Sequence, residues 1–181
     1  MLLDEQLIIS LGSLHRLDLT SCAELISRGA SVNARDIRQQ TALHYASAHN
    51  NKELSELLLN NGALVDAADQ EGLTPLHWAA DYGFAQVCGF LIDRGAQIDA
   101  KDFSGLTPLA WAAKNARTDA TFIFLDAGAN LEPLRELMLN ENFNERNREF
   151  CRIMQVWMAG RIARDAVADG AVNKPSWPQA L

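Results

Sequence analysis

DQEGLTPLHWAA, residues 69–80, is the stretch that decides the fold, because its residues return along the chain at a fixed step. Thr74 has counterparts at Thr41 and Thr107, each 33 residues away. The same step relates four further sets of positions: Asp36, Asp69 and Asp102; Leu43, Leu76 and Leu109; Ala46, Ala79 and Ala112; and the Gly-Ala pairs that begin at Gly29, Gly62, Gly95 and Gly128. Many independent positions share one period, so the sequence predicts an internal structural repeat.

Each period carries the local signals of two helices separated by turns. Thr74 can cap the start of a helix, and Pro75 suits the first helical position, where its missing N–H costs nothing. Gly83 offers a break before a second helix, whose apolar residues stand at helical spacing. Gly95 lies where the end of that helix favours a left-handed residue. Each repeat is therefore predicted to run turn, helix, turn, helix.

The segment Thr74-Pro75-Leu76-His77, followed by Ala79, resembles the signature of the ankyrin repeat, and the resemblance covers roughly residues 1 to 131. It implies an all-α fold, an ankyrin-repeat solenoid of stacked helix-turn-helix units with degenerate capping repeats at both ends. Two positions depart from the signature, since Ala42 replaces the proline and Ala110 replaces the histidine. The predicted segments are an N-terminal cap repeat (1–32), three clear repeats (33–65, 66–98 and 99–131), a helical C-terminal cap (132–173) and an extended tail (174–181).

The period fails after residue 131, where an enlarged capping repeat is expected. A helix from about residue 146 to 167 places Phe150, Ile153, Met154 and Trp157 on one side. The ends of a repeat array need a covered apolar face, which favours the capping interpretation. The alternative is a helix that binds a partner or forms a dimer, although nothing else in the sequence indicates a homo-oligomer.

Composition and charge limit the function classes. The 181 residues are 48% hydrophobic and 22% charged, as in ordinary globular proteins, and the net charge is -7. This acidic balance argues against nucleic acid or an anionic membrane as partner, and favours a partner protein with a basic surface. The same charge can also serve solubility alone. Three scattered cysteines, no signal-like start and no long apolar run predict a reduced, cytoplasmic protein.

No catalytic, cofactor-binding or metal-binding residues are predicted, so the chain is expected not to be an enzyme. His44 and His77 share the repeat position whose role in ankyrin repeats is structural hydrogen bonding. The recurring aspartates are interpreted as turn-formers rather than as acids or bases, and the cysteines at one shared position as packing residues. The aromatic residues that share another position are expected to fill the space between repeats, with a binding surface as the alternative: Tyr45, Trp78 and Trp111.

The resemblance also implies where a partner would bind, because ankyrin repeats bind through the tips of their turns and the exposed side of their first helices. The apolar residues among these positions are unusual for solvated turns and favour an interaction site. The candidate turn-tip residues are Ile37, Arg38, Gln40, Gln70, Glu71, Leu73, Phe103, Ser104 and Leu106. The candidate helix residues are Ala48, His49, Asp81, Tyr82, Lys114 and Asn115.

The expected function is a protein–protein interaction module, acting as an adaptor or an inhibitor. A short array without a catalytic domain also resembles immunity proteins or anti-defence factors, which block one enzyme or toxin. A remote alternative is an enzyme subunit whose activity lies in residues 132–181, although no catalytic spacing is present there.

Overall fold

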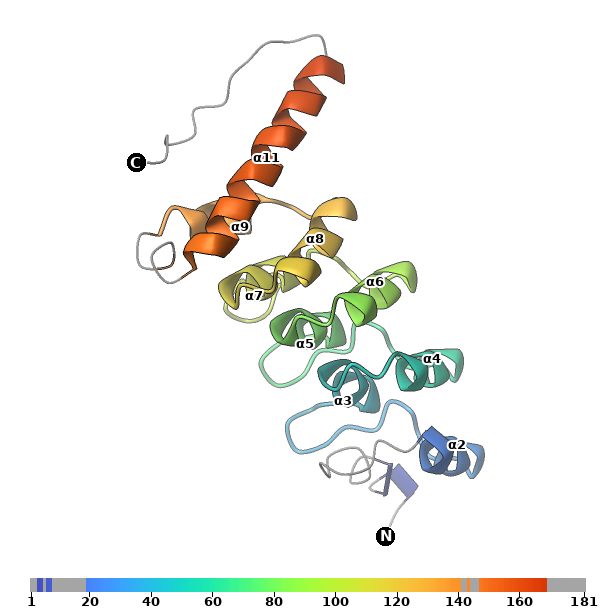
Figure 1. Ribbon diagram of the computed structural model, residues 1–181. Helices are drawn as coiled ribbons and strands as arrows, with labels where there is room; N and C mark the ends of the chain where they lie inside the picture. Colours follow the sequence, from blue (N-terminus) through green and yellow to red (C-terminus); the bar gives the residue numbers. More distant parts are fainter. Residues whose placement is uncertain (1–2, 5, 8–18, 141–142, 144–146, 169–181) are drawn as a thin grey trace. The chain divides into compact units, whose positions relative to one another are not determined.

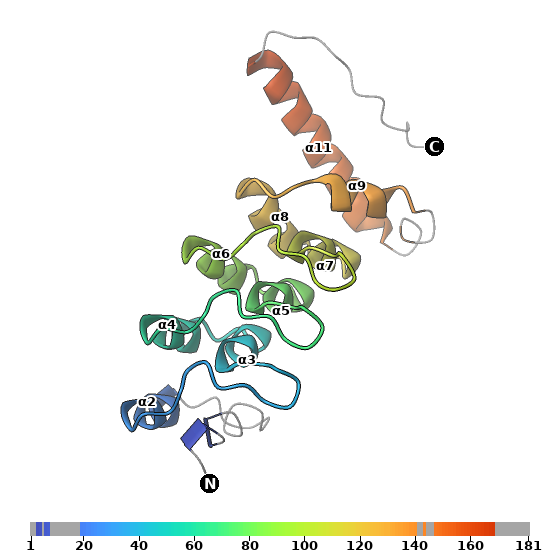
Figure 2. The ribbon, with the colours of Figure 1, turned by 180° about the vertical axis from the view of Figure 1, so that it is seen from behind.

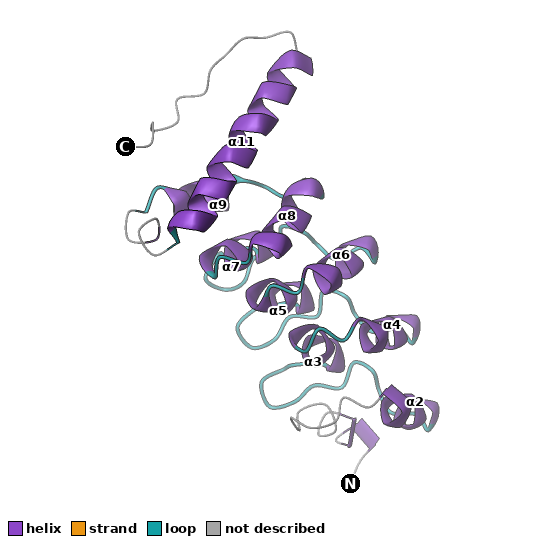
Figure 3. Cartoon of the chain, viewed as in Figure 1, coloured by secondary structure: helices purple, strands orange, loops and turns teal. Residues whose placement is uncertain are grey.

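The computed structural model describes residues 3–4, 6–7, 19–140, 143 and 147–168 (Figure 1). Over these residues the chain consists of helices and turns without strands (Figure 3), which confirms the predicted all-α solenoid. The chain forms two compact units, Met1–Leu139 and Asn140–Leu181, which are described separately below.

The first unit is built from three helix pairs at the predicted step. The pairs are α3 (Ala42–Ala48) with α4 (Lys52–Asn60), α5 (Pro75–Tyr82) with α6 (Ala85–Asp93), and α7 (Pro108–Lys114) with α8 (Thr118–Asp126). The first helices α3, α5 and α7 pack in one row, and the second helices pack in a parallel row that begins with α2 (Leu19–Ser27) (Figure 2). A short helix, α9 (Glu132–Met138), packs on α7 and ends the row of first helices.

The core lies between the two rows and repeats with the sequence. Leu58, Leu91 and Phe124 share one position on the second helices, and all three are fully buried. A neighbouring position admits only small side chains, and Cys22 and Cys88 both occupy it, buried and free. The expected packing role of these two cysteines is confirmed, and burial raises the pKa of Cys88 to about 12.

The breaks between helices use left-handed backbone, as predicted for the glycines. Gly62 and Gly95 end the second helices with φ of 85° and 87°, and Gly83 separates α5 from α6 with φ of 81°. The counterparts of Gly83 in the neighbouring repeats are Asn50 and Ala116, which adopt φ of 54° and 52°. A side chain with a Cβ is strained in this region, so both positions carry a local conformational cost.

The second unit contains the long helix α11 (Arg148–Ala168), close to the helix predicted from about residue 146 to 167. Within this unit, the ring of Phe143 meets that of Phe150 edge-on, with 6.2 Å between centroids. The capping role of this segment stays a prediction. The predicted tail at 174–181 and most of the predicted first helix of the N-terminal repeat lie outside the described residues. Among the helices that are described, none is both long and apolar enough to cross a membrane.

Candidate functional site

Each turn is organised by one aspartate. The Oδ1 atom of Asp69 accepts the backbone N–H groups of Glu71 and Leu73, both at 2.9 Å, and its Oδ2 atom accepts the indole N–H of Trp78 at 3.1 Å. The same three bonds recur at Asp36, which receives the Tyr45 hydroxyl, and at Asp102, which receives the Trp111 indole. The interpretation of these aspartates as turn-formers is confirmed.

Successive turns are joined through their backbones into a continuous row of tips. The N–H of Gln70 donates to the carbonyl of Arg38 at 2.9 Å, and the N–H of Phe103 donates to the carbonyl of Glu71 at 3.0 Å. The ring of Phe103 lies directly on Gly72, where an added Cβ would stand 2.7 Å from the ring. The tip backbones are therefore fixed by the fold, while most of their side chains remain free to vary.

The two histidines of the repeat signature join each first helix to the following repeat. The Nδ1 atom of His77 accepts the backbone N–H of Thr74 at 3.1 Å and its hydroxyl at 2.9 Å. This leaves the proton on Nε2, which donates to the carbonyl of Leu106 at 3.2 Å. His44 makes the equivalent bonds to Thr41 and to the Leu73 carbonyl. These bonds confirm the expected structural role, and burial lowers the pKa of both histidines.

The aromatic residues that share one position on the first helices each bond to the aspartate of their own turn. Tyr45, Trp78 and Trp111 are only half-buried, because their bonds to the turn aspartates hold the rings at the foot of the turns. The packing interpretation of these residues stays a prediction, as does the alternative of a binding surface. The sequence contains a periodic signal of these aspartate-to-ring bonds, since each aromatic residue follows its aspartate by nine residues.

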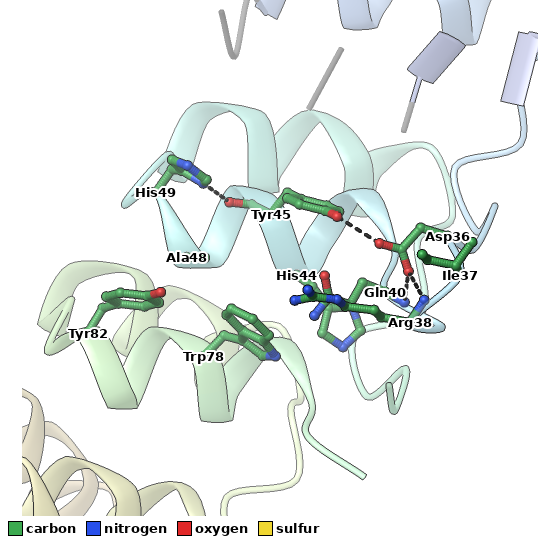
Figure 4. Close-up of a pocket in the computed structure, with 10 residues that line it drawn as sticks. All are labelled: Asp36, Ile37, Arg38, Gln40, His44, Tyr45, Ala48, His49, Trp78 and Tyr82. Carbon is green, nitrogen blue, oxygen red and sulfur yellow. Dashed lines mark hydrogen bonds between the residues drawn. The ribbon is translucent and has the colours of Figure 1, made fainter. Parts of the chain in front are cut away.

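A groove of about 640 Å³ lies where the first turn, α3 and α5 meet (Figure 4). Tyr45, Ala48 and His49 line it from α3, and Trp78 and Tyr82 line it from α5. The turn contributes Asp36, Ile37, Arg38 and Gln40, and His44 of α3 completes the lining. The rings from α5 continue as a stack, in which Tyr82 lies 6.3 Å from Trp78 and 5.8 Å from Phe84 between centroids.

Most of the predicted partner-binding residues are at the surface. Ile37 is 95% exposed, Phe103 79% and Tyr82 44%. Asp81 is half-buried. The other exposed candidates are Arg38, His49, Gln70, Glu71, Ser104, Lys114 and Asn115.

Two predicted tip residues are not exposed. Gln40 is 6% exposed and Leu73 is 8% exposed, which corrects their assignment to the accessible tips. Both residues stand at the end of their turn, just before the next helix, and the backbone N–H of each donates to the aspartate of that turn. Leu106 occupies the same position in the third repeat and is half-buried.

Asp81, on α5, is bonded to residues of the third repeat. The Asp81 carboxylate accepts the side-chain amide of Asn115 at 2.5 Å, and its backbone carbonyl accepts Nε of Arg117 at 2.8 Å. Burial raises the pKa of Asp81. In the third repeat, Nζ of Lys114 lies 5.0 Å from the centroid of the Trp111 ring. Within the described part of the chain, no cluster of His, Cys, Asp or Glu could hold a metal ion.

Comparison with known proteins agrees with this architecture. A family model described as ankyrin repeats, in three copies, matches residues 14–102 and 69–135. No curated protein matches the sequence. The matched segments span the stacked helix pairs and include the turn aspartates and signature histidines described above. The chain belongs to the ankyrin-repeat family.

Proposed function

We propose that this chain is a non-enzymatic binding module that holds a partner protein on its turn tips and first helices. Ankyrin repeats are generally protein–protein interaction modules. The observation that carries the proposal is the exposure of large apolar side chains on these elements, chiefly Ile37, Phe103 and Tyr82. Exposed apolar groups rimmed by charge mark interaction sites.

The fold itself does not require these side chains. Ile37, Gln70 and Phe103 occupy one position in three successive turns, although they differ in size and polarity. The position of Tyr82 holds His49 and Asn115 in the neighbouring repeats. By contrast, the aspartate that organises each turn is the same in all three repeats, at Asp36, Asp69 and Asp102. The varying tip residues are therefore free to be selected for a partner.

The finer features of the proposal follow from charge and from hydrogen bonding. The net charge of -7 favours a partner with a basic surface. The turn aspartates and His44 and His77 are engaged in structural bonds, which supports a role without catalysis. In this proposal the module acts in the cytoplasm as an adaptor or inhibitor. Blocking one enzyme or toxin, as an immunity protein or anti-defence factor does, is one form of that inhibition.

The test removes two exposed rings and leaves the repeat core intact. We expect the double variant Tyr82→Ala, Phe103→Ala to lose the partner captured from the native host by the unaltered chain, as identified by mass spectrometry. Aromatic residues of this kind contribute about 2 kcal/mol or more each when they dominate an interface. The thermal midpoint should fall by only a few degrees, because Phe103 is 79% exposed and Tyr82 is 44% exposed.

The matched control is Glu53→Ala, which changes an exposed residue on the second helix α4 and should retain capture. If the double variant unfolds, the two rings belong to the core and the surface assignment fails. If it stays folded and still captures the partner, binding lies elsewhere, and α11 becomes the next segment to test.

A further inference from the structure

We propose that the groove between α3 and α5 receives a cationic side chain, an arginine or lysine of a basic partner segment, on the face of Trp78 beside Tyr82. This inference rests on the proposed protein-binding function and specifies the chemistry of its partner. Three observations carry it: a cation already seated on the equivalent ring, carboxylates bonded to the groove rings, and the balance of charge around the groove.

The chain itself contains such a pair one repeat later. Lys114 stands three residues after Trp111 on α7 and places Nζ 5.0 Å from the ring centroid, within the range of a cation–π contact. The counterpart of Trp111 on α5 is Trp78, but the counterpart of Lys114 is Asp81. The second repeat therefore presents an equivalent indole and replaces the covering cation with a carboxylate.

The groove rings are well suited to bind a cation. The indole N–H of Trp78 donates to the Asp69 carboxylate at 3.1 Å, and the Tyr45 hydroxyl donates to the Asp36 carboxylate at 2.7 Å. Donation to a carboxylate increases the electron density of a ring, and the ring face is already the negative part of its quadrupole. These faces attract a positive charge more strongly than rings without such a bond would.

The charges around the groove also favour a cation. Asp36 lines the groove and Asp69 accepts the indole N–H of Trp78, so two carboxylates stand at the groove rings, whereas Arg38 is the one arginine or lysine among the lining residues. A cationic side chain on Trp78 is thus attracted by the carboxylates and repelled by Arg38. An acidic segment would be attracted by Arg38 alone.

A variant that lacks the Arg38 charge can therefore show whether the occupant of the groove is cationic or acidic. If the occupant is cationic, Arg38→Gln removes a repulsion and strengthens binding; if the occupant is acidic, the same change weakens binding. Lys114→Gln is a second variant with a predicted gain, because it uncovers the Trp111 ring for a cation. The matched control is Arg94→Gln, which removes the same charge from the end of α6 in the row of second helices.

The experiment uses the full chain and three labelled peptides, in which glycine alternates with arginine, lysine or glutamate. Binding is followed by fluorescence anisotropy at low and high salt. We expect the arginine and lysine peptides to bind and the glutamate peptide not to bind. Trp78→Leu should weaken binding of the arginine peptide about fivefold or more, and Arg38→Gln should strengthen it about two- to fivefold, as expected for single cation–π and charge contacts. Arg94→Gln should change it less than Arg38→Gln does.

A measurement on the unaltered chain keeps the test valid if Trp78→Leu fails to fold. The indole N–H resonance of Trp78 should shift in NMR spectra as the arginine peptide is added, and should not shift with the glutamate peptide. The inference is overturned if the arginine peptide does not bind, if the Trp78 resonance stays fixed, or if Arg38→Gln weakens binding. If these peptide tests fail but the Tyr82→Ala, Phe103→Ala variant still loses its host partner, the cation inference is wrong and the proposed protein-binding function stands.

Discussion

Replacing His77 with alanine tests the bond that joins one repeat to the next. His77 is 1% exposed and takes part in three hydrogen bonds, two from Thr74 and one to the Leu106 carbonyl. Each neutral bond contributes about 1 kcal/mol, and the buried groups left without a partner add their desolvation cost. We therefore expect the free energy of unfolding to fall by about 2 to 4 kcal/mol. The third repeat carries Ala110 at this position, so the helix backbone accommodates the change.

The assay is unfolding in urea at pH 7.5, followed by far-ultraviolet circular dichroism and analysed by linear extrapolation. The matched control is His49→Ala, since His49 is exposed and its side chain bonds only within its own helix. The control should change the free energy of unfolding by less than about 0.5 kcal/mol. A loss below about 1 kcal/mol for His77→Ala would refute the reasoning, because the bond to Leu106 would then contribute nothing beyond packing.

Three further predictions concern stability. Burial lowers the folded-state pKa of His44 and His77, so the unfolded chain binds more protons below about pH 6.5 and stability should fall there as pH decreases, by up to about 1.4 kcal/mol per pH unit for each histidine. Urea titrations should show a smaller slope for His44→Ala, His77→Ala, and an equal slope would contradict the assignment. Leu91→Ala should cost about 2 to 5 kcal/mol in the same assay, since Leu91 is fully buried, and a loss under about 1 kcal/mol would place it outside the core. Ala116→Gly should raise stability by about 0.5 to 1 kcal/mol by relieving the strain at φ of 52°, whereas a loss would show that Ala116 is not strained.

The helices and the core could be predicted from the sequence because they depend on contacts that repeat. Leu58 and Leu91 stand 33 residues apart and meet the same surroundings, so one period predicts both. The turn aspartates and the signature histidines were interpreted correctly for the same reason. Their bonds, such as that of Asp69 to Trp78, recur at constant spacing in every complete repeat.

The shape of the candidate site could be predicted only in part. Leu73 was assigned to an exposed tip but is buried, and its carbonyl is bonded to His44 of the preceding repeat, 29 residues away, a contact that the pattern within one repeat does not specify. The groove was missed because it is lined by residues of the first turn, α3 and α5 together, which a shared repeat position does not specify. The nine-residue spacing between aspartate and ring could have indicated it.

The substitution of alanine at position 110 determines how the array can grow by duplication. His44 and His77 each donate to the turn of the following repeat, whereas after Ala110 the chain enters α9 and residue 139, the counterpart of Leu106, ends that helix. An in-frame copy of residues 66–98 would preserve every histidine-to-carbonyl bond. A copy of residues 99–131 would place Ala110 before a turn whose carbonyl then lacks a donor. A duplicated repeat is therefore accommodated in the middle of the array and not at its C-terminal end.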